Sequence, residues 1–245
     1  MTPRERFPTG MNDLFAEVTP PDEIQKLAEG AILLRRFAVN SAEPIVQTVW
    51  RIAEVSPFRH MITPGGYRMS VAMTNCGRAG WTTDRHGYRY VTIDPETGAA
   101  WQPMPPDFHR LAETAAERAG FAGFKPDSCL INRYEPGTKL SLHQDRNEKS
   151  YESPIVSVSL GLPAKFLFGG LTRNERPQRL WLESGDVVVW GGPSRLAFHG
   201  VDTLAKGDHP LTGPYRLNLT FRKALDRASS AGLPRPREAQ SRDAR

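Results

Sequence analysis

Short segments of strand type fill the chain from residue 129 onward, and they restrict the possible fold more than any other feature. Each is rich in Val, Ile, Leu, Phe or Tyr, and Gly, Pro or Asn separates most of them. About eight such strands with turn signals between them are typical of a jelly roll or a related β-sandwich. The expected strands cover residues 129–134, 140–145, 155–160, 165–168, 179–183, 186–190, 197–200 and 216–222.

Helices are expected before this region, so the chain as a whole is predicted to be α+β and mainly β. A short helix is expected at residues 22–28, and a buried strand at 31–38, where apolar side chains run together. A longer helix should begin after Ser41, a suitable N-cap, and end before Pro57. A second helix is predicted at 106–119, because it opens with proline and carries apolar residues on one face.

One main domain with additions is expected, because 245 residues with 39% hydrophobic composition can bury a single core. Residues 1–60 should form an N-terminal extension with helices that pack on this core. Residues 61–103, with paired glycines and several aromatic and basic side chains, are predicted to form hairpins and loops. The helix and jelly-roll core should cover 104–224. A basic tail at 225–245, poor in large apolar residues, is expected to be disordered.

Cysteine content and hydropathy bear on the compartment. The two cysteines, Cys76 and Cys129, are too few for a disulfide framework. No run approaches the roughly 20 apolar residues that span a bilayer, and the first residues lack the apolar stretch of a signal peptide. We therefore expect a cytoplasmic monomer with no membrane partner.

The net charge of +5 suggests a nucleic-acid partner, but the position of the charge matters more than its sum. Six Lys or Arg residues against three acidic residues lie from Lys223 onward, which leaves little excess charge on the folded body. Basicity alone therefore does not identify a partner.

His143 and Asp145 are the first candidate metal ligands. Residues two apart in a strand face the same way, with Cα atoms roughly 6.6 Å apart, which suits two ligands of one ion. The motif is weak alone, because a surface histidine beside a solvated aspartate has the same spacing. A third ligand has to come from a later strand, and His199, at the end of an apolar run, is the candidate.

Two imidazoles and one carboxylate on a β-sandwich match the facial triad of non-haem iron(II), which leaves positions open for substrate and oxygen. A buried structural histidine is the alternative for His199 taken alone. A structural zinc site would need four ligands, usually with thiolate, and neither cysteine is suitably placed. The sequence therefore favours iron.

Residues 216–222 alternate between polar and apolar side chains. Arg216, Asn218, Thr220 and Arg222 should share one face of a strand, and leucine and phenylalanine the other. An ordinary solvent-facing edge is one interpretation. The other is a cavity for a small dicarboxylate, because the planar guanidinium of arginine binds carboxylate with two hydrogen bonds. Asn132 and Tyr134, on an earlier strand, could add neutral hydrogen bonds.

Five stretches are specific when taken together: MSVAMTNC at 69–76, LINRY at 130–134, LSLHQD at 140–145, GDVVVW at 185–190 and NLTFR at 218–222. They resemble the AlkB family of iron(II)- and 2-oxoglutarate-dependent nucleic-acid dealkylases, over roughly residues 31–223. The resemblance implies a double-stranded β-helix core, that is, a jelly roll.

The resemblance also implies an enzyme, a dioxygenase with Fe(II) on His143, Asp145 and His199, and with 2-oxoglutarate and O2 as co-substrates. Such an enzyme repairs N1-methyladenine and N3-methylcytosine in single-stranded or duplex DNA, with RNA as a further candidate. It releases aldehyde, succinate and CO2. Arg216, with Tyr134, would pair with the distal carboxylate of the co-substrate. The other residues implied to frame it are Asn132, Asn218, Thr220 and Arg222.

In the resembling family, the loops before the β core form a nucleotide-recognition lid, here residues 61–103. A methyl group on the pairing edge of a base cannot be reached inside a duplex, so the nucleotide must be flipped out or already single-stranded. Trp81 is expected to stack on that base opposite His143, although a partly buried core tryptophan is the alternative. The other expected substrate-binding residues are Met73, Tyr88, Arg89, Tyr90, Lys139, Asn147 and Arg173.

Asn147 departs from the family pattern, because the corresponding residue of the best-known member is an acid that binds the exocyclic amino group of the base. An amide can accept the same hydrogen bond, but it carries no charge to favour a cationic base. The preference between adenine and cytosine is therefore open. Two other functions are also considered: a metal-free nucleic-acid-binding module, and a related oxygenase that hydroxylates a protein or small molecule.

Overall fold

Strands rich in β-branched and aliphatic side chains build a seven-stranded antiparallel sheet, called here the major sheet. The structure is a computed structural model, and it describes residues 23–225. β8 (Ile155–Gly161) and β13 (Arg216–Arg222) lie in the middle of the sheet and are buried at every position. The full order is β1 (Ile24–Ala28), β2 (Ala31–Leu34), β11 (Val187–Trp190), β8, β13, β6 (Ser128–Tyr134) and β3 (Ala72–Gly77).

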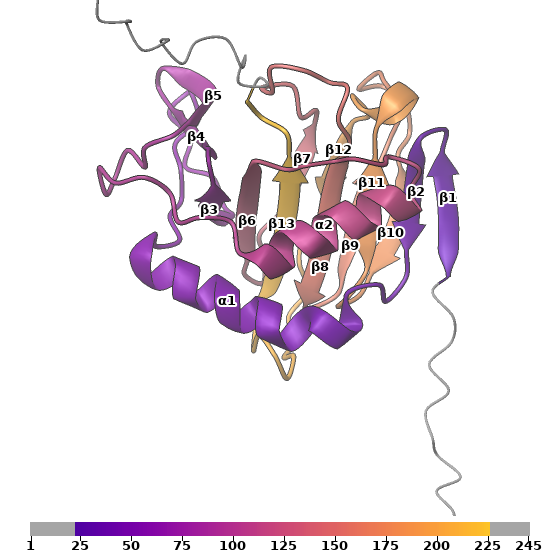
Figure 1. Ribbon diagram of the computed structural model, residues 1–245, viewed down its shortest axis with the longest axis horizontal. Helices are drawn as coiled ribbons and strands as arrows, with labels where there is room; N and C mark the ends of the chain where they lie inside the picture. Colours follow the sequence, from indigo (N-terminus) through magenta and orange to yellow (C-terminus); the bar gives the residue numbers. More distant parts are fainter. Residues whose placement is uncertain (1–22, 226–245) are drawn as a thin grey trace, which may run out of the picture.

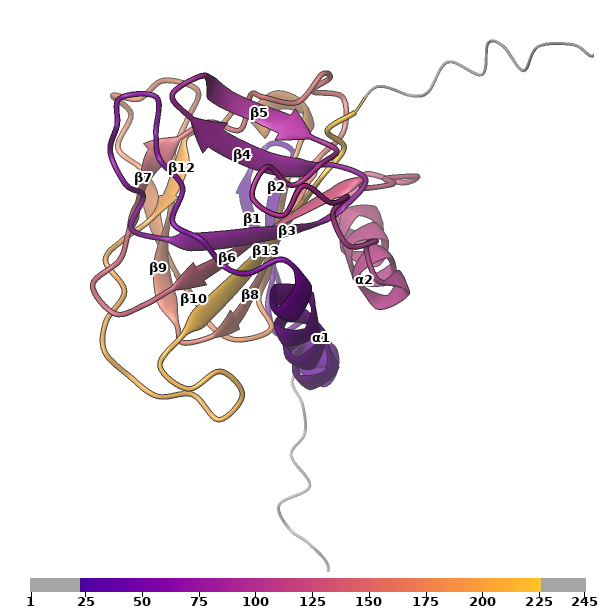
Figure 2. The same ribbon diagram turned by 90° about the vertical axis from the view of Figure 1, so that its left-hand side faces the viewer.

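A four-stranded antiparallel sheet, the minor sheet, faces the major sheet (Figure 2). Its strands alternate between buried and more exposed residues, as in β9, where Phe166 and Phe168 are buried and Lys165 is exposed. The buried rings contact Trp190 of the major sheet, so an apolar layer joins the two sheets. The order is β10 (Gln178–Leu182), β9 (Ala164–Phe168), β12 (His199–Val201) and β7 (Leu140–His143).

Two helices cover the other face of the major sheet (Figures 1 and 2). They are α1 (Ala42–Val55), which follows the short 3-10 helix η1 (Val39–Ser41), and α2 (Pro106–Arg118). Phe108 of α2 packs edge-on against Phe221 of β13, with ring centroids 6.0 Å apart. Among the described residues, no helix is long and apolar enough to cross a membrane.

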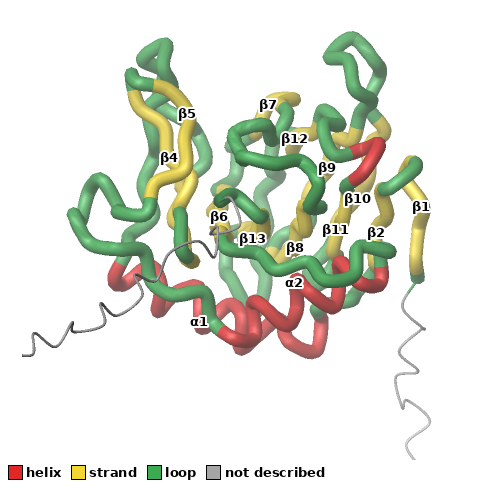
Figure 3. Tube along the Cα trace, turned by 45° about the horizontal axis from the view of Figure 1, so that its top comes forward, coloured by secondary structure: helices red, strands yellow, loops and turns green. Residues whose placement is uncertain are grey.

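A separate hairpin, β4 (Gly80–Asp84) and β5 (Gly87–Val91), rises beside β3 (Figures 1 and 3). The Asn75 side chain fixes its base: its amide nitrogen donates to the Trp81 carbonyl, and its oxygen accepts from the Trp81 amide, both at 3.0 Å. A second 3-10 helix, η2 (Gly192–Ser194), precedes β12. The hairpin therefore has a defined position relative to the sandwich.

The predicted mainly β fold is confirmed, and every strand expected after residue 128 is present. The helix expected at 22–28 is wrong. Ile24–Ala28 form β1, which pairs with β2 across a turn at Gly30, where φ is +73°. Ser41 makes no side-chain capping hydrogen bond, because η1 already leads into α1. Of the tail expected at 225–245, residues 226–245 lie outside the described residues.

Gly161 ends β8 in a left-handed conformation, φ +84°, and a Cβ there would lie 2.6 Å from the Tyr215 carbonyl oxygen. Gly137 has a similar φ of +89°, but no atom lies within 4 Å of its Cβ position. We predict that Gly137→Ala lowers the free energy of unfolding by about 1 kcal/mol, for the backbone conformation alone. Gly161→Ala should cost about 3 kcal/mol, since overpacking adds to the strain. Urea denaturation measures both, and equal losses would contradict the argument.

Candidate metal centre and co-substrate cavity

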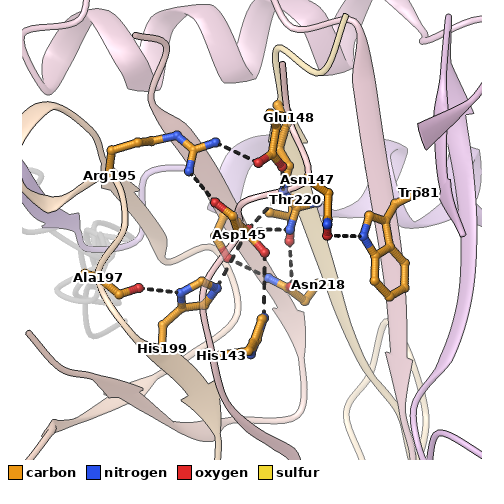
Figure 4. A network of polar contacts seen from close by, with 12 residues as sticks. Trp81, His143, Asp145, Asn147, Glu148, Arg195, Ala197, His199, Asn218 and Thr220 are labelled. Atoms are coloured by element: carbon orange, nitrogen blue, oxygen red, sulfur yellow. Dashed lines mark hydrogen bonds and ion pairs between the residues drawn. The ribbon is translucent and has the colours of Figure 1, made fainter. Parts of the chain in front are cut away.

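His143, Asp145 and His199 lie together between the two sheets. His143 ends β7 and His199 begins β12, and the two are directly paired in the minor sheet, which brings their ring centroids within 4.3 Å. Asp145 lies in the loop after β7 and turns back toward both rings (Figure 4). One possible ligand atom from each residue lies within 4.8 Å of the others. The sequence therefore predicted the right cluster.

The two histidines present the ring nitrogen that a metal needs. His143 Nδ1 lies 2.9 Å from the Ser141 carbonyl oxygen, and His199 Nδ1 lies 3.0 Å from that of Ala197. A carbonyl oxygen only accepts, so each Nδ1 carries a proton, and in a neutral ring this tautomer leaves the lone pair on Nε2. These Nε2 atoms face Asp145, at 3.7 and 3.8 Å from its carboxylate oxygens.

The charge states also suit metal ligands. Burial lowers the pKa of His199 to about 3, and the nearby His143 acts in the same direction, so His199 is a neutral imidazole at physiological pH. Burial raises the pKa of Asp145, but Arg222 and the two histidines outweigh it and hold that pKa well below the ordinary value. A carboxylate and two neutral imidazoles are the donor set of the non-haem iron(II) facial triad, so the residues fit this ion.

The polar face of β13 points into the same cavity as these three side chains. Arg216, Asn218, Thr220 and Arg222 are all buried and line a cavity of about 670 Å³. The opposite face of the strand, with Leu217, Leu219 and Phe221, joins the core under the helices. The solvent-facing interpretation of this strand is therefore wrong, because its polar face lines a cavity; that the cavity binds a dicarboxylate stays a prediction.

Arg216 is a buried cation without a carboxylate partner among the described residues. It is 1% exposed, and its guanidinium lies 4.9 Å from the centre of the Tyr134 ring. Nη2 donates to the Ser159 hydroxyl at 3.0 Å, whereas Nε and Nη1 have no hydrogen-bond partner. Burial lowers its pKa, against the effect of Tyr134. Since an unpaired buried charge is costly, this end of the cavity fits the carboxylate of a ligand.

Neutral groups lie between the two arginines of β13. Asn132 donates to the side-chain oxygen of Asn218 at 3.2 Å, and Thr220 donates to that oxygen at 3.1 Å. The side-chain oxygen of Asn132 is buried without a partner. At the far end, Arg222 donates to Asp145 through Nε and Nη2, at 2.9 and 2.5 Å. Arg222 thus orients the carboxylate of the metal cluster, and its Nη1 has no partner.

Sequence reasoning missed a second buried carboxylate, Glu148. It accepts a hydrogen bond from the Tyr90 hydroxyl at 2.7 Å and forms ion pairs with Arg195 at 3.1 Å and Arg222 at 3.4 Å. Arg195 also donates to the backbone carbonyl of Asp145 at 2.7 Å (Figure 4). Burial raises the pKa of Tyr90 well above its ordinary value, so the hydroxyl keeps its proton. Local patterning contained no signal for Glu148, which lies in a polar run.

Most of the expected substrate-binding residues line the cavity, namely Met73, Trp81, Tyr88, Lys139, Asn147 and Arg173. The Trp81 and Tyr88 rings stack, with centroids 5.7 Å apart, and Trp81 Nε1 donates to the Asn147 oxygen at 3.2 Å. Two expected residues do not line it. Arg89 pairs with Asp84 on its own hairpin, and Tyr90 points to Glu148.

Comparison with known proteins gives consistent relatives. The family model described as the 2OG-Fe(II) oxygenase superfamily matches residues 30–222. Alpha-ketoglutarate-dependent dioxygenase AlkB of Escherichia coli (strain K12) is 60% identical over 214 residues, which cover 87% of this chain and 98% of that protein. The AlkB homologue of Caulobacter vibrioides (strain NA1000 / CB15N) is 44% identical over 76% of this chain and 83% of its own. The solved structure of OsALKBH1 superposes with a TM-score of 0.72 at 31% identity, covering 82% of this chain and 99% of that one.

Glu148→Gln tests the buried network. The amide keeps the shape of the side chain but leaves Arg195 without a charged partner, so we predict a loss of about 3 kcal/mol in the free energy of unfolding. Glu135→Gln is the matched control, because Glu135 pairs with Arg133 at 3.0 Å with 43% of its side chain exposed. It should cost less than about 1 kcal/mol. Urea denaturation of both variants is the measurement, and a Glu148→Gln loss as small as the control would argue against the network.

Proposed function

The chain belongs to the 2OG-Fe(II) oxygenase superfamily and, within it, to the AlkB family, and from this premise we propose that it removes alkyl groups oxidatively from nucleic-acid bases. The substrates would include N1-methyladenine and N3-methylcytosine in DNA. One observation carries the proposal: a single cavity contains the His143, Asp145 and His199 cluster, the unpaired Arg216 and the stacked Trp81.

We assign the residues as follows. His143, Asp145 and His199 would hold Fe(II). Arg216, with Tyr134, would bind the distal carboxylate of 2-oxoglutarate. Asn132, Asn218, Thr220 and Arg222 would hydrogen-bond along the co-substrate or orient its neighbours. When bound, the ion supplies, with 2-oxoglutarate and O2, the oxidising chemistry that yields succinate, CO2 and the hydroxylated alkyl group, which leaves as aldehyde.

The chain itself positions the base and keeps the cavity ordered. A flipped-out or single-stranded base would enter beside Trp81 and Tyr88, since a flat aromatic ring supports any base. The His143 ring would form the other wall. Asn147, already fixed by Trp81, would present its amide to the edge of the base. Lys139 and Arg173, at the rim, would contact phosphates, whereas Tyr90 would act through Glu148.

The division of the chain that we propose follows these roles. Residues 61–103 would act as the nucleotide-recognition lid and 104–224 as the catalytic core, with residues 23–60 packed on it. Residues 1–22 of the expected extension and 226–245 of the expected tail lie outside the described residues. We also propose that the protein acts as a monomer. The two free thiols are buried, which suits a cytoplasmic enzyme. DNA is the proposed substrate, and RNA is the alternative.

A turnover assay tests the function. Protein loaded anaerobically with Fe(II) is mixed with 2-oxoglutarate and a methylated oligonucleotide, oxygen is admitted, and formaldehyde and restored base are measured. We expect both products in equal amounts, and none above background for His143→Ala. Loss of 2-oxoglutarate without restored base would favour an oxygenase of another substrate class. Oligonucleotide binding without any turnover would favour a non-catalytic module.

Asn147→Asp tests how the base is recognised. The variant should keep the hydrogen bond from Trp81 and add a negative charge beside the base. For the cationic N1-methyladenine we predict a rise in kcat/KM of roughly tenfold, since a charge-assisted hydrogen bond is about 1 kcal/mol or more stronger than a neutral one. A neutral lesion, N3-methylthymine, is the internal control and should gain nothing. Equal changes for both lesions would contradict this role of Asn147.

A further inference from the structure

The outward face of the β9–β10 hairpin carries an exposed tryptophan between cations. Trp181 of β10 is 46% exposed, whereas its neighbours Leu180 and Leu182 are buried in the layer between the sheets. Trp181 is paired directly across the hairpin with Lys165 of β9. Arg179 lies two residues before Trp181, on the same face and about 7 Å away along the strand. Both cations are exposed.

The cations of this face are available to a ligand. Among the described residues, neither Lys165 nor Arg179 forms an ion pair, and the same holds for Arg176 in the loop that joins the two strands. The one acid of that loop, Glu175, accepts hydrogen bonds from the Thr172 backbone and hydroxyl, at 3.0 and 2.8 Å. We call Lys165, Arg176, Arg179 and Trp181 the hairpin strip.

Two further acids lie at the borders of the hairpin strip. Asp202 donates its backbone amide to the Lys165 carbonyl, but its carboxylate accepts a hydrogen bond from the Thr203 amide at 2.8 Å. Glu183 follows the end of β10 and is exposed. Neither forms an ion pair with the cations of the strip, so the face keeps a positive excess at Arg176 and Arg179.

The hairpin strip is continuous with the mouth of the cavity. The loop from Gly169 to Pro177 connects β9 to β10, and Arg173 of this loop lines the cavity. β10 is the edge strand of the minor sheet, at the end away from the β4–β5 hairpin (Figure 3). A polymer whose damaged unit occupies the cavity can therefore leave across Arg173 and run along Arg176 and Arg179 to Trp181.

We propose that the hairpin strip binds the single-stranded flank of the nucleic-acid substrate, at a place separate from the base pocket. A base of the flank stacks on Trp181, while Lys165, Arg176 and Arg179 contact phosphates. Alternating cations and an aromatic platform form the usual surface for single strands without sequence preference. The inference rests on the proposed function, because it takes the substrate to be a nucleic acid.

A protein partner fits this face less well. Protein interfaces are enriched in tryptophan and arginine, which this face has, but they are depleted of lysine, and their buried core is more apolar than the rest of the surface. Here the exposed ring has a cation on each side and one partly buried leucine, Leu167, on the same face. Unpaired cations complement a polyanion, and counterion release from the phosphates adds to the affinity.

Trp181→Ala is the test, with Val55→Ala as the matched control, because Val55 is 54% exposed on α1 on the far side of the major sheet. The first readout is kcat/KM on a methylated 5-mer and on a methylated 20-mer. The second is the binding of unmodified oligothymidylate of the same two lengths, measured by fluorescence anisotropy without iron. For Trp181→Ala we expect roughly tenfold weaker binding of the 20-mer and a roughly tenfold higher KM on the methylated 20-mer. Binding and KM of the 5-mer should be unchanged. Trp181→Phe should restore both values for the 20-mer.

The cations add an independent measure. Replacing Lys165 and Arg179 by Gln should reduce the dependence of log Kd on log salt for the 20-mer by about 0.7 for each phosphate that the variant no longer neutralises. Equal behaviour of Trp181→Ala and Val55→Ala would overturn the proposal, and so would an equal loss on both lengths. A wild-type protein that binds both lengths alike would also overturn it and point to a protein occupant. Absence of turnover on either oligonucleotide would instead refute the proposed function, since the anisotropy experiment needs no turnover.

Discussion

Burial of charge around Asp145 is the constraint on which the rest of the site depends. Two carboxylates and two guanidinium groups, from Asp145, Glu148, Arg195 and Arg222, lie together with little access to water. Each would be costly to bury alone, and only their mutual pairing makes the arrangement stable. Because they come from the loop after β7, the segment before β12 and the end of β13, the pairing holds both sheets in one relative position. Through Tyr90 it also reaches the β4–β5 hairpin.

β13 lies between the apolar core under the helices and the polar cavity between the two sheets. The helices cover one of its faces and the minor sheet lies over the other, so both faces are buried, yet one is apolar and the other polar. The apolar face joins the helices to the sheet, and this contact does not depend on any ligand. Along the polar face the pairing of the side chains changes: Arg216 at one end has no carboxylate partner among the described residues, whereas Arg222 at the other end donates to Asp145. A rigid central strand is a good support for these side chains, since its residues cannot move independently.

The sequence predicted those parts of the site that depend on local spacing. The alternation in residues 216–222 identified the polar face, because a strand in a fixed register assigns each side chain to one side. Asp145 was predicted for a partly wrong reason, since β7 ends at His143 and long-range pairing, rather than a shared strand face, returns the carboxylate to the cluster. Glu148 and Arg195 escaped prediction because their partners are distant in the sequence. Residues 24–28 form a strand because they pair with residues 31–34, and the spacing of apolar residues within 24–28 does not predict this pairing.

The unpaired guanidinium of Arg216 has a consequence beyond recognition. A cation buried without an anion makes the empty fold less stable than the same fold with a dicarboxylate in place, so ligand occupancy and folding are thermodynamically linked. The stability of the protein then rises with the logarithm of the free dicarboxylate concentration. The protein without its dicarboxylate is therefore the form that unfolds most readily.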